Sequence, residues 1–509
     1  MKLDRTSMLY GTLILTGTSI VSQFLGFVYR ILLSRLIGAE VMGLYQLIMP
    51  VFSVIMALTA VGLTVAVSNL SSQYHARGNR AAIAQVLRRC LAVFLLLFAA
   101  VAAVVVLLYD PISVYLLGDA RTQLGLLLLL PCILLTGVEN LHKHFFYGTG
   151  NIRPPAAVEL CEQFIRTGAV LGLLVVFLPQ NPERTVGLIV TGMILCELFS
   201  AVTLLLLARR HLNRAGGLTG APLEHRQLNR RIASIAVPIG LTSLLGNLMG
   251  SATSVLIPQR LVHAGAEVSE AMSAFGVLCG MTLPMLCLPT AFIGALGLVL
   301  VPKLAEGAAL GQRGLVQHRV DRSMLATSVL ILPAMAFLVV LGPTLGAALF
   351  REPTVGRSIL PLSVGVLLSC YQSVLAFNGV GRPGAAARNS ILCGVVQLGC
   401  TFFLMGLPGV GLKGYVAGFL ASAALGVLLN WWAVRRATGL RAQIFQWCTA
   451  PALSALLMGL VINLLFQVLR RASLEALPAA LACLLFGGVL YLAALQAQGI
   501  HLRRLFRLR

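Results

Sequence analysis

The stretch Thr16–Glu40, TGTSIVSQFLGFVYRILLSRLIGAE, decides how the rest of the chain is interpreted. It is apolar enough to sit inside a bilayer, yet it contains Gln23, Arg30 and Arg35. An arginine in a hydrocarbon span costs roughly 2.5–3.5 kcal/mol, so its side chain usually faces protein, water or a ligand. Gln23 and Arg30 stack on one helix face, which we interpret as a polar cavity wall. For Arg35, near the helix end, a cavity contact and a side chain that reaches the membrane surface remain alternatives.

The composition of the whole chain is that of a polytopic membrane protein. Its 509 residues are 58% hydrophobic and 11% charged, with a mean hydropathy of +0.92, whereas soluble domains carry about 25% charged residues. A helical span needs about 20 apolar residues, which gives this chain room for about 12 to 14 spans with short loops. No polar block remains that is long enough for a soluble domain.

We therefore expect an all-α integral membrane protein with about 14 transmembrane helices. The first apolar run continues through Arg30 without a small-residue cleavage site, so we interpret it as a span and not as a signal peptide. The expected spans are 8–37, 41–71, 86–109, 122–147, 155–178, 186–208, 232–260, 273–302, 322–350, 356–379, 386–407, 412–434, 447–469 and 476–498.

The net charge of +22 reflects membrane topology and not a nucleic-acid partner. Most of the 38 Lys and Arg residues fall in one set of alternate loops between the apolar runs. Since such loops are usually cytoplasmic, we expect a multi-pass protein of a bacterial plasma membrane with both termini in the cytoplasm. The 11 cysteines are scattered without any C-x-x-C, so neither disulfides nor a metal site is expected.

An internal repeat divides the expected helices into two groups of six. Pro50 aligns with Pro284, and Gly148 with Gly379, at nearly the same offset. Parallel repeats of this kind are typical of transporters in which two halves move about a central site. We expect an N-lobe at 1–210, a basic cytoplasmic linker at 211–231, a C-lobe at 232–436, and two further helices with a basic tail at 437–509.

A second group of charged residues lies in the fifth expected span. Glu159, Glu162 and Arg166 are spaced by three and four residues and so share one helix face. We favour a polar cavity wall, and the alternative is a self-neutralised pair that locks packing. Asn247 lies in a polar run of the seventh span, where substrate contact and close helix packing are both open.

Further ionisable residues lie in the fourth and sixth spans. Glu139 and Glu197 add to the set of polar residues inside spans. The run His142-Lys143-His144 has the residue types of a metal site, but no further ligand lies nearby in sequence. We expect that run to be a solvated loop edge.

No motif of an enzyme active site is present. The chain has no P-loop lysine motif, no Gly-x-Ser-x-Gly and no His-Glu-x-x-His. We therefore expect a protein that is not an enzyme, with no catalytic residues and no cofactor. Transport work would come from a coupling ion, H⁺ or Na⁺, or from the membrane potential.

The chain resembles the stage V sporulation protein B group, and the match of motifs is strongest in the first 75 residues. This group belongs to the polysaccharide-transporter family of the multidrug/oligosaccharidyl-lipid/polysaccharide (MOP) flippase superfamily. The resemblance rests on LGF-x-YR (Leu25–Arg30), on SRLIGAE-x-x-GLYQ (Ser34–Gln46) and on the turn at Gly148–Pro154. It extends in length, span count and repeat over nearly the whole chain. Related lipid II flippases of the MurJ type carry cavity arginines near the first helix; Arg35 matches one, whereas Gln23 stands where they have another.

The resemblance implies a two-lobed, V-shaped fold and movement of undecaprenyl-linked saccharide between leaflets. The implied cargo is a peptidoglycan precursor such as lipid II, used in spore cortex or cell-wall synthesis. Its partners would be membrane lipid and the lipid-linked substrate. Two alternatives remain open. A cation-coupled drug antiporter of the same superfamily would need a cavity carboxylate, which the first span lacks. A non-transporting membrane scaffold for wall assembly would not need buried charge.

Overall fold

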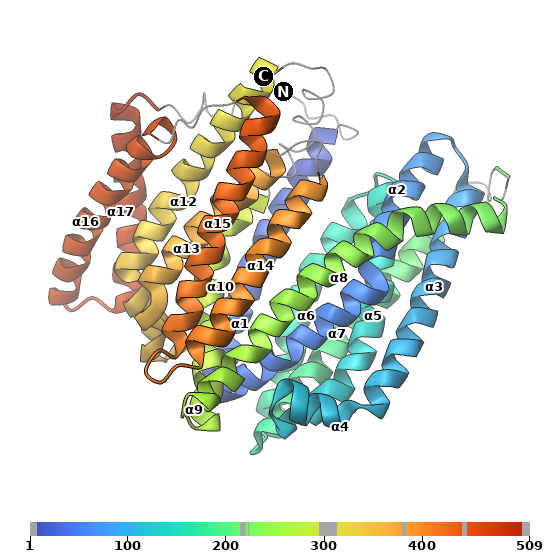
Figure 1. Ribbon diagram of the computed structural model, residues 1–509, viewed down its shortest axis with the longest axis horizontal. Helices are drawn as coiled ribbons and strands as arrows, with labels where there is room; N and C mark the ends of the chain where they lie inside the picture. The colour runs from blue at the N-terminus through green and yellow to red at the C-terminus, as the bar shows by residue number, and fades with distance from the viewer. Residues whose placement is uncertain are drawn as a thin grey trace. The chain divides into compact units, whose positions relative to one another are not determined.

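The computed structural model describes residues 8–213, 220–221, 223–294, 313–378, 383–439 and 445–500. Every regular element within these residues is a helix (Figure 1). The described part of the chain contains 13 segments that are long and apolar enough to cross a membrane. The first of them, Thr16–Ala76, has 61 residues and is long enough for two crossings. The all-α fold with about 14 transmembrane helices is thereby confirmed.

The first two crossings meet at a break within α1 (Met8–Met56). Gly38 has φ 75° and ψ 179°, so the helix is interrupted there. Glycine reaches a positive φ without the steric penalty that a Cβ atom brings. The break falls between the spans expected at 8–37 and 41–71. The helix that carries Gln23, Arg30 and Arg35 is thus separate from the one that follows.

The chain divides into two compact units. The first comprises Met1–Gln259 and Glu267–Gly276. Besides α1, its elements are η1 (Ala57–Val61), α2 (Gly62–Ala76), α3 (Arg80–Leu107), α4 (Tyr109–Pro111), η2 (Ile112–Leu117), η3 (Ala120–Thr122), α5 (Gln123–Gly148), α6 (Arg153–Phe177), α7 (Pro182–Asn213), α8 (His225–His263, in this unit up to Gln259) and α9 (Val268–Phe275).

The second unit comprises Arg260–Ala266 and Val277–Arg509. Its described elements are η4 (Gly276–Thr282, in this unit from Val277), α10 (Leu283–Cys287), η5 (Leu288–Thr290), α12 (Arg313–Phe350), η6 (Pro353–Ser358), α13 (Ile359–Asn378), α14 (Pro383–Met405), α15 (Leu412–Thr438), η7 (Phe445–Thr449), α16 (Ala450–Arg471) and α17 (Ala476–Ala497). One cluster of buried side chains in this unit comes from α12, α16 and α17, and in it the Tyr491 hydroxyl donates to the Val329 carbonyl at 3.0 Å.

The boundary between the units lies near the end of α8, between Gln259 and Arg260, whereas the expected linker lies at 211–231. The lobe assignment at 1–210 and 232–436 stays a prediction. Gly379, one member of the repeat, lies outside the described residues.

Close helix contacts in the first unit depend on glycine. A Cβ atom at Gly43 in α1 would lie 2.2 Å from the carbonyl oxygen of Met272 in α9. A Cβ atom at Gly276 would lie 2.0 Å from the carbonyl oxygen of Ala39. Small residues let membrane helices approach to backbone contact. These two glycines hold α9 and the residue that follows it against α1.

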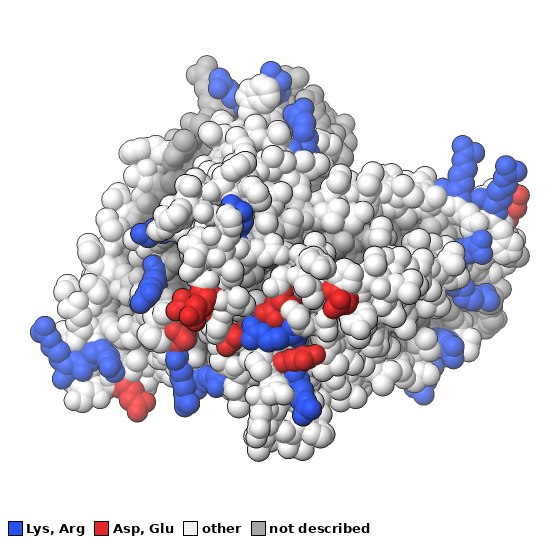
Figure 2. Space-filling model, turned by 60° about the horizontal axis from the view of Figure 1, so that its bottom comes forward, with Lys and Arg blue, Asp and Glu red and all other residues white. Residues whose placement is uncertain are grey.

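Charged side chains cover a small part of the face shown in Figure 2, and most of that face is neither acidic nor basic. One ion-pair group joins α1 to η3: Arg121 contacts Glu40 and Asp119, each at 2.7 Å. The Asp119 carboxylate also accepts from the Arg121 backbone N–H at 2.9 Å. This group fixes the chain just beyond the break at Gly38.

Candidate functional site: a buried charge network beside Arg30

Five ionisable side chains from α5, α6 and α7 form one network. The Arg166 guanidinium contacts Glu162 at 2.5 Å and Glu197 at 2.9 Å through the same terminal nitrogen. The Lys143 ammonium contacts Glu139 at 2.6 Å and Glu162 at 3.4 Å. Glu162 therefore bridges both cations, and the network joins three consecutive helices.

The carboxyl groups of the network are almost fully buried, and they outnumber its cations. Glu139, Glu162 and Glu197 are only 2%, 5% and 3% exposed. They face two cations, so the group has an excess of one acidic side chain. Buried charges are tolerated only when partners and additional hydrogen bonds offset their desolvation. The Thr136 hydroxyl supplies one such bond to Glu197 at 2.9 Å.

Local sequence spacing explains half of this geometry, and helix packing explains the rest. The pairs Glu139–Lys143 and Glu162–Arg166 are four residues apart and lie on single helix faces. Glu197 reaches Arg166 because α7 approaches α6 at Gly192. A Cβ atom there would lie 2.8 Å from the Val170 Cα atom. Glycine at this position permits the contact.

The charge network contains one geometric cluster of possible metal ligands. Ligand atoms of Glu162, Cys196 and Glu197 lie within 4.8 Å of one another. The Arg166 guanidinium already contacts both carboxylates, and the Cys196 thiol donates to the Glu162 backbone carbonyl at 3.3 Å. The positive charge that a metal ion would supply is therefore provided by the arginine. The cluster is better described as a salt-bridged packing site.

Arg30 lies beside this network on α1. Gly26, one turn earlier, faces Gln163 of α6: a Cβ atom there would lie 3.8 Å from the Gln163 Oε1 atom. The hydroxyls of Tyr29 and Tyr45 are within electrostatic range of both Arg30 and Arg166. Arg30 is half-buried. Among the residues that the structure describes it forms no ion pair, which distinguishes it from Arg166.

The remaining predicted site residues are dispersed. Gln23 and Arg35 are exposed on α1. Glu159 is half-buried and acts electrostatically on Lys143. Asn247 donates to the Ser243 carbonyl of its own helix at 2.8 Å. The structure therefore brings together Glu162 and Arg166 with Arg30 nearby, and it leaves Gln23, Arg35 and Asn247 outside the network.

The expectation of a solvated edge at His142-Lys143-His144 is wrong. His142 is 4% exposed, and the Lys143 side chain is 14% exposed and doubly paired. The cause is the fold of α6 against α5, which places Glu162 opposite Lys143. The four-residue spacing of Glu139 and Lys143 could have predicted their ion pair. The contact of Lys143 with Glu162 on α6 could not be predicted from the sequence.

These features define a multi-pass, all-helical membrane protein with ionisable side chains held inside its first unit. Its sequence matches the polysaccharide biosynthesis protein family over residues 8–308. Since the match spans more than half of the chain, the chain belongs to this family.

Two curated relatives from Bacillus subtilis (strain 168) extend the match over most of the chain. Stage V sporulation protein B is 26% identical over 444 residues, which is 84% of this chain and 83% of the relative. Lipid II flippase MurJ is 23% identical over 461 residues, which is 84% of this chain and 81% of the relative. These matches confirm the family resemblance expected from Leu25–Arg30 and Ser34–Gln46.

Solved structures share the fold. The inward-facing conformation of a multidrug resistance MATE family transporter of the MOP superfamily has a TM-score of 0.68 at 16% identity, covering 83% of this chain and 96% of that one. Lipid II flippase MurJ in an inward closed conformation has a TM-score of 0.65 at 12% identity, covering 94% of this chain and 98% of that one. At these identities the likeness concerns the fold alone.

Proposed function

We propose that the protein is a flippase for undecaprenyl-pyrophosphate-linked saccharide. The cargo is a peptidoglycan precursor resembling lipid II, moved from the cytoplasmic to the outer leaflet by alternating access in spore cortex or cell-wall synthesis. The observation that carries the proposal is Arg30, a half-buried guanidinium on a membrane helix without an ion-pair partner among the described residues. The family membership and the curated relatives support the same substrate class.

Arg30 is suited to the pyrophosphate of such a cargo. A guanidinium offers a planar fork of donors that fits phosphate oxygens, and it keeps its charge at all physiological pH values. Arg166 already donates to two carboxylates, so we assign it a positioning role in the wall of the site. Glu162 and Glu159 belong to that wall. Gln23, Arg35 and Asn247 remain proposed contacts for other parts of the cargo.

A cation-coupled antiporter is the second candidate, and one observation favours it. The network of Glu139, Glu162 and Glu197 has one carboxyl more than its two cations, and the excess group could exchange a proton with a transport cycle. Proton exchange at this carboxyl group could equally drive the flipping of a lipid-linked substrate. The non-transporting scaffold has no comparable support, because a scaffold does not need the unpaired Arg30.

Reconstituted transport separates these candidates. The purified protein is placed in liposomes with fluorescent lipid II, and a membrane-impermeant quencher reads the outer-leaflet label. Parallel liposomes are loaded with a cationic dye and given a proton gradient. The proposal predicts faster lipid II equilibration than in protein-free liposomes. Dye movement without lipid II movement would establish the antiporter, and movement of neither by folded protein would favour the scaffold.

A further inference from the structure

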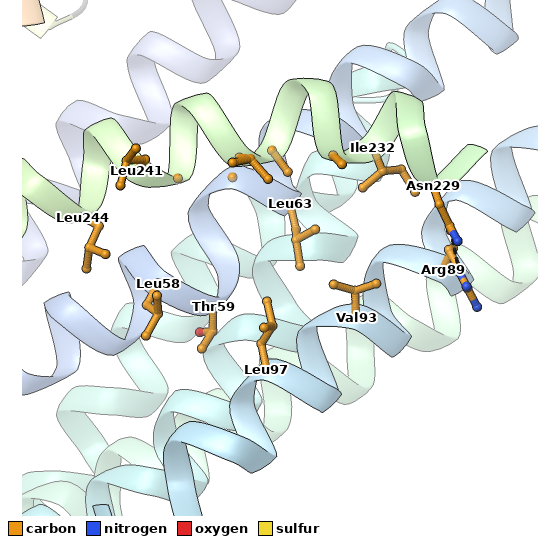
Figure 3. A pocket seen from close by; sticks show the side chains of 15 residues that line it. Leu58, Thr59, Leu63, Arg89, Val93, Leu97, Asn229, Ile232, Leu241 and Leu244 are labelled. Atoms are coloured by element: carbon orange, nitrogen blue, oxygen red, sulfur yellow. Dashed lines mark hydrogen bonds between the residues drawn. The ribbon is translucent and has the colours of Figure 1, made fainter. Parts of the chain in front are cut away.

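A groove in the first unit is separate from the charge network. It has a volume of about 400 Å³ and lies between η1 and α2 on one side, α3 on another, and α8 (Figure 3). Its walls are apolar side chains such as Leu63, Val93 and Leu241. Leu58, Leu97 and Leu241 are 46%, 39% and 56% exposed. The groove is therefore open along its side and not an enclosed void.

One end of the groove is polar and positively charged. Arg89 of α3 and Asn229 of α8 face each other there (Figure 3), and the Arg89 Nε–H donates to the Asn229 Oδ1 at 2.8 Å. None of the fifteen residues that line the groove is acidic. The terminal nitrogens of Arg89 form no hydrogen bond or ion pair with the residues that the structure describes. The positive charge of the Arg89 guanidinium is therefore not neutralised by any lining residue, and it lies at one end of the apolar groove.

The shape of the groove is fixed by a backbone contact between α2 and α8. A Cβ atom at Gly62 would lie 2.2 Å from the carbonyl oxygen of Ala236, so only glycine allows the two helices to meet there. The contact brings α8 onto α2, and α3 completes the wall. Thr59, the other uncharged polar lining residue besides Asn229, donates its hydroxyl to the Ile55 carbonyl at 2.7 Å. It therefore presents no free donor to the groove.

The length of the groove matches one acyl chain within one leaflet of a bilayer. Lining residues extend from Arg89 to Leu97 on α3, about 12 Å at 1.5 Å per residue. On α8 they extend from Asn229 to Leu244, about 22 Å by the same rise. Half of a bilayer core is about 15 Å. The basic end lies where the apolar part of α3 begins, so we expect it to lie at the level of lipid headgroups.

We propose that this groove binds one acyl chain of an anionic membrane phospholipid, with the headgroup phosphate on Arg89. The apolar walls suit a hydrocarbon chain, the guanidinium and the Asn229 amide suit phosphate oxygens, and the absence of acidic lining residues selects for negative charge. The volume is at the lower end of the ~300–1,000 Å³ range of ligand pockets. That suits a single acyl chain better than the much longer undecaprenyl chain. The bound lipid would hold α8 against α2 and α3.

Lipid retention by the purified full-length protein tests the proposal. Native mass spectrometry counts dioleoyl-phosphatidylglycerol or dioleoyl-phosphatidylcholine bound to protein released from neutral detergent. Phosphatidylglycerol is expected to be retained at about tenfold lower concentration, and Arg89→Gln should remove that preference, because the substitution removes the positive charge that contacts the phosphate. Leu97→Trp, which fills the groove, should reduce retention of both lipids.

Two neighbouring residues provide matched controls. Arg88→Gln removes the adjacent exposed arginine, which does not line the groove, and Leu96→Trp places the same bulk on the outer side of α3. Neither is expected to change retention. Equal losses of phosphatidylglycerol retention in Arg88→Gln and Arg89→Gln would show that general surface charge causes the preference, and this result would contradict the proposed site. Undisturbed retention in Leu97→Trp, or stronger retention of undecaprenyl phosphate than of phosphatidylglycerol, would also contradict it.

Discussion

At the scale of single residues, two arginines in membrane helices have different environments. Arg166 has two carboxylate partners, whereas Arg30 has none among the described residues. Removing one member of a buried ion pair destabilises a structure, whereas a half-buried cation without an ion-pair partner is available to a ligand. The spacing of Glu162 and Arg166 predicted their pairing. Glu197 and Lys143 could not be predicted as partners, because their approach depends on how α5, α6 and α7 pack.

Replacing Arg166 with methionine is expected to destabilise the first unit. The substitution leaves Glu162 and Glu197 without their guanidinium in a buried setting, and loss of one member of a buried pair costs about 3–5 kcal/mol. The measurement is the thermal unfolding midpoint of the purified protein in detergent. Arg88→Met, on the exposed face of α3, is the control. A midpoint equal to that of the wild type would show that the network contributes nothing to stability.

At the scale of elements, glycine positions determine how the helices of the first unit are broken and packed. Gly38 separates the first two spans. The apolar pattern of the sequence predicted a boundary between residues 37 and 41, where this glycine lies. The contacts at Gly43, Gly62 and Gly192 were not predicted. Each depends on which distant helix lies opposite, and apolar sequence carries little information about that. The number of spans was therefore predictable, whereas their neighbours were not.

Gly43→Ala is expected to reduce stability, whereas Gly17→Ala should not. The added methyl group at Gly43 would lie 2.2 Å from the Met272 carbonyl oxygen, so α9 must move, while nothing lies within 4 Å of the corresponding atom at Gly17. Alanine is otherwise about 1 kcal/mol better than glycine inside a helix. The yield of monodisperse protein after detergent extraction is the measurement. Equal yields for the two variants would contradict the packing described for α1 and α9.

At the scale of the whole molecule, composition and span count predicted the fold class, and the motifs in Leu25–Arg30 and Ser34–Gln46 predicted the family. Both are confirmed because hydrophobic length and local motifs are properties of the chain itself. The coupling ion, the cytoplasmic location of the termini and the cargo contacts remain predictions. They depend on the membrane and on ligands, which are external to the sequence.

The most direct test of the central claim compares flipping by wild type, Arg30→Ala and Arg30→Lys. Each variant is reconstituted with fluorescent lipid II, and the rate at which label becomes accessible to the quencher is measured with and without a membrane potential. We predict that Arg30→Ala slows equilibration by about tenfold or more, since charged hydrogen bonds contribute about 1.5–3 kcal/mol. Arg30→Lys should retain part of the rate. Wild-type speed in a correctly folded Arg30→Ala protein would contradict the account.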